Sequence, residues 1–156
     1  MALLKVGGRA PDFVLPSQSG EMVRLSDYLG KNVVLYFYPK DFTAGCTAEA
    51  KAFRESYQEF YDSNTEVIGV SADSVETHER FVQRCGLPFK LLSDSAKEVR
   101  ELYGASSFFG AGRVTYVIDT RGTVRFVFNS LVRPTRHVRE ALAALKAEKE
   151  ALPRSI

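Results

Sequence analysis

The sequence of 156 residues contains no tryptophan, only two cysteines and only two histidines. Without tryptophan, it cannot build a catalytic site that depends on an indole side chain. Cys46 and Cys85 are too few for a disulfide framework, and with His78 and His137 they form neither a Cys-x-x-Cys pair nor a zinc-type cluster. A disulfide-stapled scaffold and a zinc domain are therefore excluded, and each cysteine needs its own explanation.

Strong net charge and long apolar runs are also missing. Lys and Arg number 21 against 19 Asp and Glu, so the net charge of +2 provides no field to attract nucleic acid or an anionic membrane. No stretch approaches the about 20 apolar residues of a membrane span. Met1–Leu15 lacks the apolar core of a secretory signal. We expect a soluble, cytoplasmic protein.

What is present is an uninterrupted alternation of strands and helices. With no repeat, low-complexity block or linker, and with 45% hydrophobic residues, the chain suits a single domain over residues 1–156. The apolar run Val33–Tyr38 predicts a buried strand, and Cys46–Tyr61 has the periodicity of an amphipathic helix. Thr65–Ser71 and Ser74–Cys85 repeat this strand and helix, which implies parallel pairing.

Two hairpins and two further helices complete the pattern. Turn-forming residues separate the strands of each hairpin, and amphipathic periodicity marks each helix. The strands are Asp12–Leu15, Met22–Leu25, Val114–Asp119 and Val124–Asn129, and the helices are Ala96–Tyr103 and Pro134–Glu150. This order predicts an α/β chain of thioredoxin-like fold, with a central mixed β-sheet flanked by helices and an N-terminal β-hairpin.

Cys46 lies where the buried strand gives way to the amphipathic helix. The first N–H groups of a helix lack internal partners and carry the positive end of the helix dipole, which favours a thiolate. Cysteines in such places have pKa values of about 3.5 to 7.5 instead of about 8.5, so the nucleophilic form is abundant at neutral pH. Position alone leaves two interpretations open, a reactive nucleophile or a small buried apolar residue.

Two neighbours favour the reactive interpretation. The Thr43 hydroxyl can cap the helix and hold an oxygen against the sulfur. Pro39 can shield the site and fix the loop without leaving an unpaired donor. Taken singly, Thr43 is also an ordinary N-cap and Pro39 an ordinary strand terminator.

The spacing of these three residues resembles a known signature. Pro39, three residues, Thr43, two residues and Cys46 match the pattern of the peroxiredoxin family, after an aromatic strand. Ala10–Phe13 and Arg113–Asp119 resemble further segments of the same family. The resemblance covers nearly the whole chain.

The segment Thr43–Glu49 is similar to the Thr-Pro-Gly-Cys-Thr-x-Glu motif of the bacterioferritin comigratory protein (peroxiredoxin Q) subgroup, with Ala44 in place of the proline. This resemblance implies a thiol peroxidase that needs no metal, flavin or other cofactor. The Cys46 thiolate would attack the terminal peroxide oxygen and become a sulfenic acid. The site residues that the resemblance implies are Pro39, Thr43, Gly45, Cys46 and Arg113.

Arg113 is the implied cation for the charge that develops as the O–O bond breaks. Its guanidinium stays charged and offers several donors toward sulfur and peroxide. Arg121 and Arg125 show that solvated strand-end arginines are common nearby, so only the motif separates Arg113 from them.

Three other polar side chains are not expected to react. Glu49 is expected in the first helical turn, where the dipole favours a carboxylate that orients local polar groups. A cysteine hydrolase would require a histidine beside Cys46. Neither His78 nor His137 lies in a segment that the family brings to the thiol, so we expect surface or packing roles for both.

The second half of the catalytic cycle is assigned to Cys85. Many members of the subgroup carry a resolving cysteine five residues after the first, where this chain has Lys51. A second subgroup pattern places the resolving cysteine in the helix that holds Cys85, which implies a Cys46–Cys85 disulfide reduced by thioredoxin or a similar dithiol protein. Reaching disulfide distance requires local unwinding, for which Gly45 and Gly86 offer flexible points. Cys85 as a plain core residue stays open, and the protein would then be a one-cysteine peroxiredoxin.

Alternatives from other classes differ in strength. A thioredoxin-like reductase would need a second thiol near Cys46, and a glutathione-peroxidase-like enzyme would need a tryptophan. A peroxide sensor could use the same thiol without turnover, and it remains the main alternative. The subgroup is often monomeric, and no C-terminal arm carries a further cysteine, so we expect a monomer.

Overall fold

A computed structural model describes residues 3–107 and 110–151 of the chain. Its central sheet has five strands in the order β5-β4-β3-β8-β9. They are β3 (Asn32–Phe37), β4 (Thr65–Ser71), β5 (Lys90–Ser93), β8 (Val114–Ile118) and β9 (Val124–Asn129). Strands β3, β4 and β5 run parallel, whereas β8 is antiparallel to both β3 and β9. The predicted mixed α/β sheet is confirmed.

The remaining elements flank this sheet. The N-terminal hairpin, also confirmed, pairs β1 (Val14–Pro16) with β2 (Met22–Arg24). The helices are η1 (Leu25–Tyr28), α1 (Ala44–Glu55), α2 (Tyr57–Asp62), α3 (Val75–Cys85), α4 (Glu98–Leu102) and α5 (Arg136–Ala151). A small ribbon pairs β6 (Ser106–Ser107) with β7 (Gly110–Ala111).

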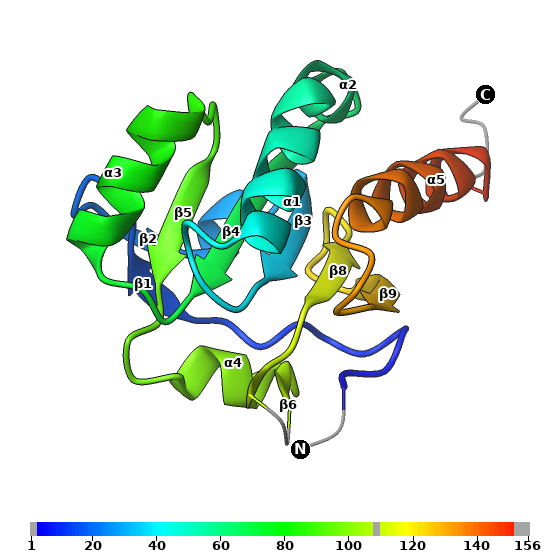
Figure 1. Cartoon of the computed structure of the whole chain (residues 1–156). Helices are drawn as coiled ribbons and strands as arrows, with labels where there is room; N and C mark the ends of the chain where they lie inside the picture. The colour runs from blue at the N-terminus through cyan, green and yellow to red at the C-terminus, as the bar shows by residue number, and fades with distance from the viewer. Residues whose placement is uncertain (1–2, 108–109, 152–156) are drawn as a thin grey trace.

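Side-chain alternation along β3 divides the core into two layers, because successive residues of a strand point to opposite faces. Val34 and Tyr36 pack among residues of α1, α2, α3 and α5. Val33, Leu35 and Phe37 pack with the N-terminal segment and α4. Figure 1 shows α1, α3 and α5 on one side of the sheet and α4 near the N-terminal segment. The uninterrupted apolar run in β3 follows from this burial on both faces.

The helix predicted over Cys46–Tyr61 begins earlier and is broken in two. Helix α1 starts at Ala44, and Ser56 leaves helical geometry with φ −102° and ψ 6° before α2 begins. The Ser56 N–H is shared between the carbonyls of Ala52 and Arg54. The break lets Phe60 of α2 face the core, where its ring centroid lies 5.8 Å from that of Phe53.

The sequence prediction missed the edge strand β5 and the two-residue strands β6 and β7. Strand β5 is only four residues long, and its adjacent Leu91 and Leu92 are buried on opposite faces. Such a run has neither strand alternation nor helical periodicity. Helix α4 is also shorter than predicted, because Lys97 takes a left-handed conformation with φ 60° in front of it.

Gly69 in β4 is required by the packing of the sheet. A Cβ added there would lie 2.7 Å from Leu91 Cδ2 and 2.8 Å from Tyr36 Cζ. We expect Gly69→Ala to lower the free energy of unfolding by about 1–3 kcal/mol, because neither neighbour can move away within a close-packed core. Urea unfolding at neutral pH measures this loss, and an unchanged transition midpoint would contradict it.

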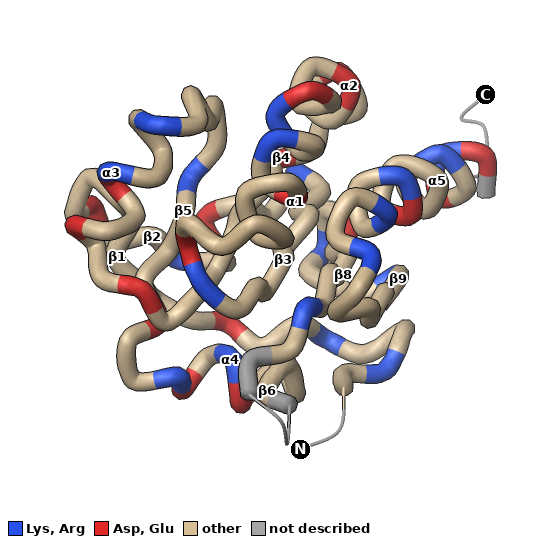
Figure 2. Tube along the Cα trace, viewed as in Figure 1, with Lys and Arg blue, Asp and Glu red and all other residues tan. Residues whose placement is uncertain are grey.

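Charge is mixed along the surface helices. Both basic and acidic residues lie along each of α3, α4 and α5 (Figure 2). Within residues 3–107 and 110–151, no helix combines the length and the apolar character needed to cross a bilayer.

Candidate active site

Cys46 is the third residue of α1, so its thiol lies in the first helical turn. The side chain is only 1% exposed and belongs to the apolar cluster between the sheet and the helices. The positive end of the helix dipole stabilises a buried thiolate at this position. Cys46 is therefore placed as the sequence predicts, at the strand-to-helix junction.

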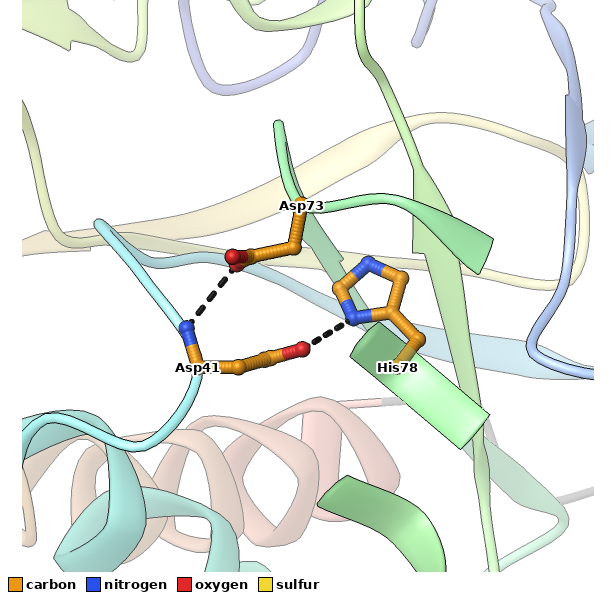
Figure 3. A group of neighbouring side chains, drawn as sticks. All are labelled: Asp41, Asp73 and His78. Atoms are coloured by element: carbon orange, nitrogen blue, oxygen red, sulfur yellow. Dashed lines mark hydrogen bonds and ion pairs between the residues drawn. The ribbon is translucent and has the colours of Figure 1, made fainter. Parts of the chain in front are cut away.

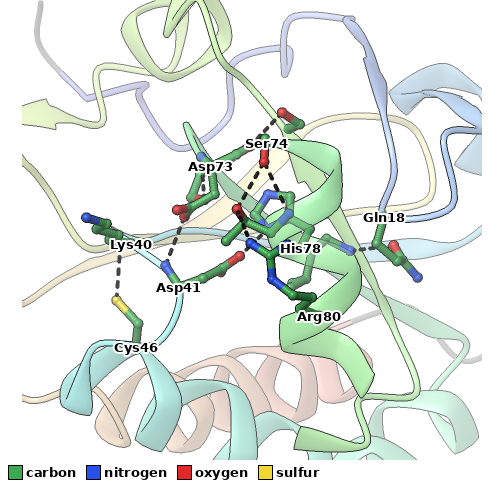
Figure 4. Close-up of polar contacts among 12 residues, drawn as sticks. Gln18, Lys40, Asp41, Cys46, Asp73, Ser74, His78 and Arg80 are labelled. Carbon is green, nitrogen blue, oxygen red and sulfur yellow. Dashed lines mark hydrogen bonds and ion pairs between the residues drawn. The ribbon is translucent and has the colours of Figure 1, made fainter. Parts of the chain in front are cut away.

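Two N–H groups donate toward the sulfur. The Lys40 backbone amide lies 3.5 Å from Cys46 Sγ, as Figure 4 shows. Arg113 Nη2 lies at the same distance of 3.5 Å. Donors to a sulfur favour its anionic form, because they stabilise charge that the neutral thiol lacks. The Lys40 amide left no signal in the sequence, because any residue supplies a backbone N–H.

Arg113 precedes β8 and is held from three sides. Its Nη1 lies 2.5 Å from Glu49 Oε1, and its Nε donates to the Leu131 carbonyl at 3.2 Å. A Cβ at Gly45 would lie 3.0 Å from Arg113 Nη2, so the missing side chain leaves room for the guanidinium. Burial alone would lower the pKa of Arg113, but Glu49 and Cys46 raise it, so the cation persists beside the sulfur.

Glu49 is more deeply involved than the sequence suggested. Because α1 begins at Ala44, Glu49 lies in the second turn and not in the first. Its side chain is 0% exposed, and Oε2 has no hydrogen-bond partner among the described residues. Burial raises the pKa of Glu49 to about 8, although Arg113 opposes that shift. The spacing from Cys46, three residues along a helix, could have indicated this shared face.

Both histidines are fully buried, so the surface role considered for them is wrong and the packing role holds. His137 Nε2 donates to the Ser130 carbonyl at 2.8 Å, and its Nδ1 lies 2.7 Å from the Thr115 hydroxyl. Burial lowers the pKa of His137 to about 4, so the ring is neutral at neutral pH. His78 instead faces the loop that precedes α1.

Thr43 takes the N-cap position of α1, but it does not cap the helix through its side chain. Its hydroxyl donates to the Lys40 carbonyl at 2.8 Å, and no cap bond from this side chain exists within the described residues. The expected side-chain cap is therefore wrong. Pro39 is half-buried and lies two residues after the end of β3, next to the Lys40 amide that faces the sulfur.

Cys85 lies at the last residue of α3, in the same apolar cluster as Cys46. Both cysteines of the chain are free thiols. The Cys85 carbonyl accepts a 2.5 Å hydrogen bond from Arg54, a residue eight positions after Cys46 and so about 12 Å further along α1. Burial raises the pKa of the Cys85 thiol, which disfavours its thiolate.

The arrangement suits a nucleophilic sulfur that reacts with a small oxidant. Cys46 has a helix N-terminus, an amide and a guanidinium around it, which can stabilise both a thiolate and negative charge on an adjacent oxygen. Neither histidine is hydrogen-bonded to the sulfur within the described residues, so the geometry does not resemble a cysteine hydrolase.

Comparison with known proteins agrees with this chemistry. Residues 6–127 match the AhpC/TSA family. A chloroplastic peroxiredoxin Q from Sedum lineare is 46% identical over 146 residues, covering 92% of this chain and 78% of the relative. The corresponding protein from Suaeda salsa is 45% identical over 150 residues, covering 94% of this chain and 70% of the relative.

Solved structures give the same result. The crystal structure of peroxidoxin BcpB from Mycobacterium tuberculosis superposes with a TM-score of 0.87 at 36% identity, covering 92% of this chain and 97% of that one. A cysteine-to-serine mutant of PrxQ from Xylella fastidiosa superposes with a TM-score of 0.87 at 28% identity, covering 96% and 99%. Its sequence relatives, its sheet and its neighbours in structure agree that the chain belongs to the AhpC/TSA family, in the peroxiredoxin Q group of thiol peroxidases.

Proposed function

We propose that Cys46 is the peroxidatic residue and that the enzyme reduces hydrogen peroxide and organic hydroperoxides. The main observation behind this proposal is that the Cys46 sulfur lies in the first turn of α1 and accepts hydrogen bonds from N–H groups of Lys40 and Arg113. Thr43, Gly45 and Pro39 shape the surrounding loop in this proposal. Residues 1–156 would form a single domain.

The first step transfers one oxygen atom to sulfur. The Cys46 thiolate attacks the terminal peroxide oxygen, so that an S–O bond forms while the O–O bond breaks. The leaving oxygen takes the electron pair and a proton, and departs as water or an alcohol. Sulfur loses two electrons, and the peroxide gains them. Arg113 and the Lys40 amide stabilise the charge on the departing oxygen.

Organic hydroperoxides are included because apolar side chains are exposed next to the site. Phe42 lies in the loop before α1, and its side chain is 51% exposed. The side chain of Leu131 is 54% exposed, and the carbonyl of this residue accepts a hydrogen bond from Arg113. Such side chains can contact an alkyl group. The bacterioferritin comigratory protein of Xanthomonas campestris, a structural neighbour at 29% identity, has alkyl peroxide reduction activity.

We further propose that Cys85 resolves the sulfenic acid. Its thiol would condense with Cys46–SOH to form a disulfide and release water, and a thioredoxin-type dithiol would then reduce the disulfide by exchange. The Cα atoms of the two cysteines must approach to about 4.4–6.8 Å, so the end of α3 and the start of α1 must move toward each other. A chain with only two cysteines has no disulfide framework, which suits a cytoplasmic location, and we propose a monomer.

Sustained turnover tests the enzymatic proposal against a peroxide sensor. With thioredoxin, thioredoxin reductase and NADPH, the wild-type protein should consume many equivalents of peroxide, and Cys46→Ser should consume none. A single stoichiometric oxidation that then stops, with any dithiol reductant, would instead identify a sensor.

Cys85→Ser tests the resolving role separately. We expect Cys46 to be oxidised by one equivalent of peroxide at the wild-type rate, because Cys85 is not among the donors to its sulfur. Turnover with thioredoxin should be lost, because the variant cannot form the disulfide. Mass spectrometry of the wild type should show the internal disulfide after one equivalent. A persistent sulfenic acid with a free Cys85 thiol would refute this assignment.

A further inference from the structure

A buried polar cluster lies behind the loop that precedes α1. Asp41 is 3% exposed, and its Oδ1 accepts a 2.6 Å hydrogen bond from the Tyr38 hydroxyl. Its Oδ2 lies 2.5 Å from Nδ1 of His78, whose side chain is fully buried. Figure 3 shows the two side chains pointing toward each other, from the loop and from α3. The peroxidase mechanism above uses neither residue.

The surroundings of His78 define its hydrogen bonds. Its Nε2 lies 3.0 Å from the Leu92 carbonyl, which can only accept, so Nε2 carries a proton. Its Nδ1 bonds to Asp41, so neither ring nitrogen is open to a metal. Asp41, Asp73 and His78 have possible metal-ligand atoms within 4.8 Å of one another. Because both nitrogens of His78 are already hydrogen-bonded, the cluster is a structural contact and not a metal site. Tyr38, Asp73 and the Arg100 guanidinium are the other ionisable groups around the pair.

The same loop presents an amide to the reactive sulfur. The Lys40 N–H that faces Cys46 directly precedes Asp41, whose own N–H donates to Asp73 Oδ2 at 2.9 Å. Figure 4 shows the Lys40–Cys46 contact on one side of the loop and the Asp41–His78 contact on the other. The orientation of the Lys40 peptide therefore depends on where Asp41 is held.

The loop also contains a backbone conformation that needs support. Phe42 has φ 66°, a left-handed conformation that is unfavourable for residues other than glycine. Its ring packs edge-on against Phe81 of α3, with 5.1 Å between centroids. Phe81 follows His78 by three residues, and both belong to the buried face of α3. Helix α3 thus holds the loop at two neighbouring points.

We propose that Asp41 and His78 are positioning residues for the peroxidase step, whose contact holds the loop so that the Lys40 N–H stays directed at Cys46 Sγ. The inference rests on the proposed role of Cys46 as nucleophile. Loss of the contact releases the loop, weakens the amide bond to sulfur and makes Cys46 less reactive.

The test measures Cys46 reactivity without requiring turnover. In a Cys85→Ser background, iodoacetamide alkylation is followed against pH, together with the single-turnover rate with hydrogen peroxide. Asp41→Ala and His78→Ala should each move the alkylation profile to higher pH and slow both reactions about tenfold at neutral pH. Asp41→Asn should remain close to wild type, because an amide of the same shape can accept from Tyr38 and donate to His78.

Two further variants separate the effect of the contact from unfolding and from a general loss of stability. Tyr38→Phe keeps the ring but removes one donor to Asp41, and should give a smaller shift in the same direction. Ser74→Ala removes the N-cap of α3, which accepts from the Thr77 N–H at 3.1 Å, and weakens the same helix without touching the loop. It should leave the alkylation profile unchanged.

Two outcomes would overturn the proposal. One is a wild-type alkylation profile in folded alanine variants or in Tyr38→Phe, and the other is an equal shift in Ser74→Ala. A wild-type protein that does not react with peroxide would refute the proposed function instead. Alkylation reports on the loop in either case, so the two failures are distinguishable.

Discussion

Arg113→Ala is expected to slow the oxidation of Cys46 by hydrogen peroxide by about 10²–10³-fold, because it removes a preorganised donor from a water-poor site. Arg113 Nη2 lies 3.5 Å from the sulfur, and Glu49 and the Leu131 carbonyl hold the guanidinium in that position. Stopped-flow measurement of the second-order rate constant tests this. Arg113→Lys should recover only part of the rate, because an ammonium cannot bind Glu49, Leu131 and the sulfur at the same time.

Arg125→Ala is the matched control. Arg125 also belongs to the strand region, but its partners are Asp119 at 2.7 Å and Glu148 at 3.4 Å, and its side chain is largely exposed. Its loss should leave the peroxide rate constant unchanged. Equal effects of the two alanine substitutions would mean that Arg113 acts through general charge or stability and not through its contact with sulfur.

Glu49→Gln is expected to make the protein more resistant to alkaline pH. Glu49 has a pKa of about 8 in the folded protein and about 4.5 when unfolded, because burial penalises its charged form. Such a raised pKa contributes stability that is fully present below about pH 4.5 and is lost as pH rises through about pH 8. The wild type should lose on the order of 4 kcal/mol from this group between about pH 5 and about pH 9.

Glutamine keeps an oxygen acceptor for Arg113 but cannot ionise, so the variant should lack this part of the pH dependence. Urea unfolding of both proteins at the two pH values measures the difference, and other ionisable groups cancel in the comparison. Parallel losses of stability in the two proteins would show that Glu49 is already charged at low pH, paired with Arg113.

The sequence predicts the frame of the site because local patterns determine it. The apolar run of β3, the amphipathic face of α1 and the proline between them place Cys46 at a helix start. Those patterns are periodic and need no knowledge of distant residues. Glycine is the residue that most readily ends a helix in a left-handed conformation, and Gly86 ends α3 with a φ of 62°.

The polar contacts around the site depend on residues far apart in the chain. Asp41 and His78 are separated by 37 positions, and Glu49 and Arg113 by 64. Glu49 has the composition of an exposed helix face, yet it lies on the stripe that contains Cys46, Ala50 and Phe53. Its burial depends on Arg113, which no pattern within α1 reveals. The direction of the Thr43 hydroxyl is likewise a choice of rotamer that spacing does not fix.

The most direct test of Cys46 as the peroxidatic residue is to locate the oxidised sulfur. Cys85→Ser and Cys46→Ser proteins are each treated with one equivalent of hydrogen peroxide in the presence of dimedone, which traps sulfenic acids, and their peptides are examined by mass spectrometry. We expect complete labelling at Cys46 in the first protein and no labelling in the second. An unlabelled Cys46 beside unconsumed peroxide, or a labelled Cys85, would contradict it.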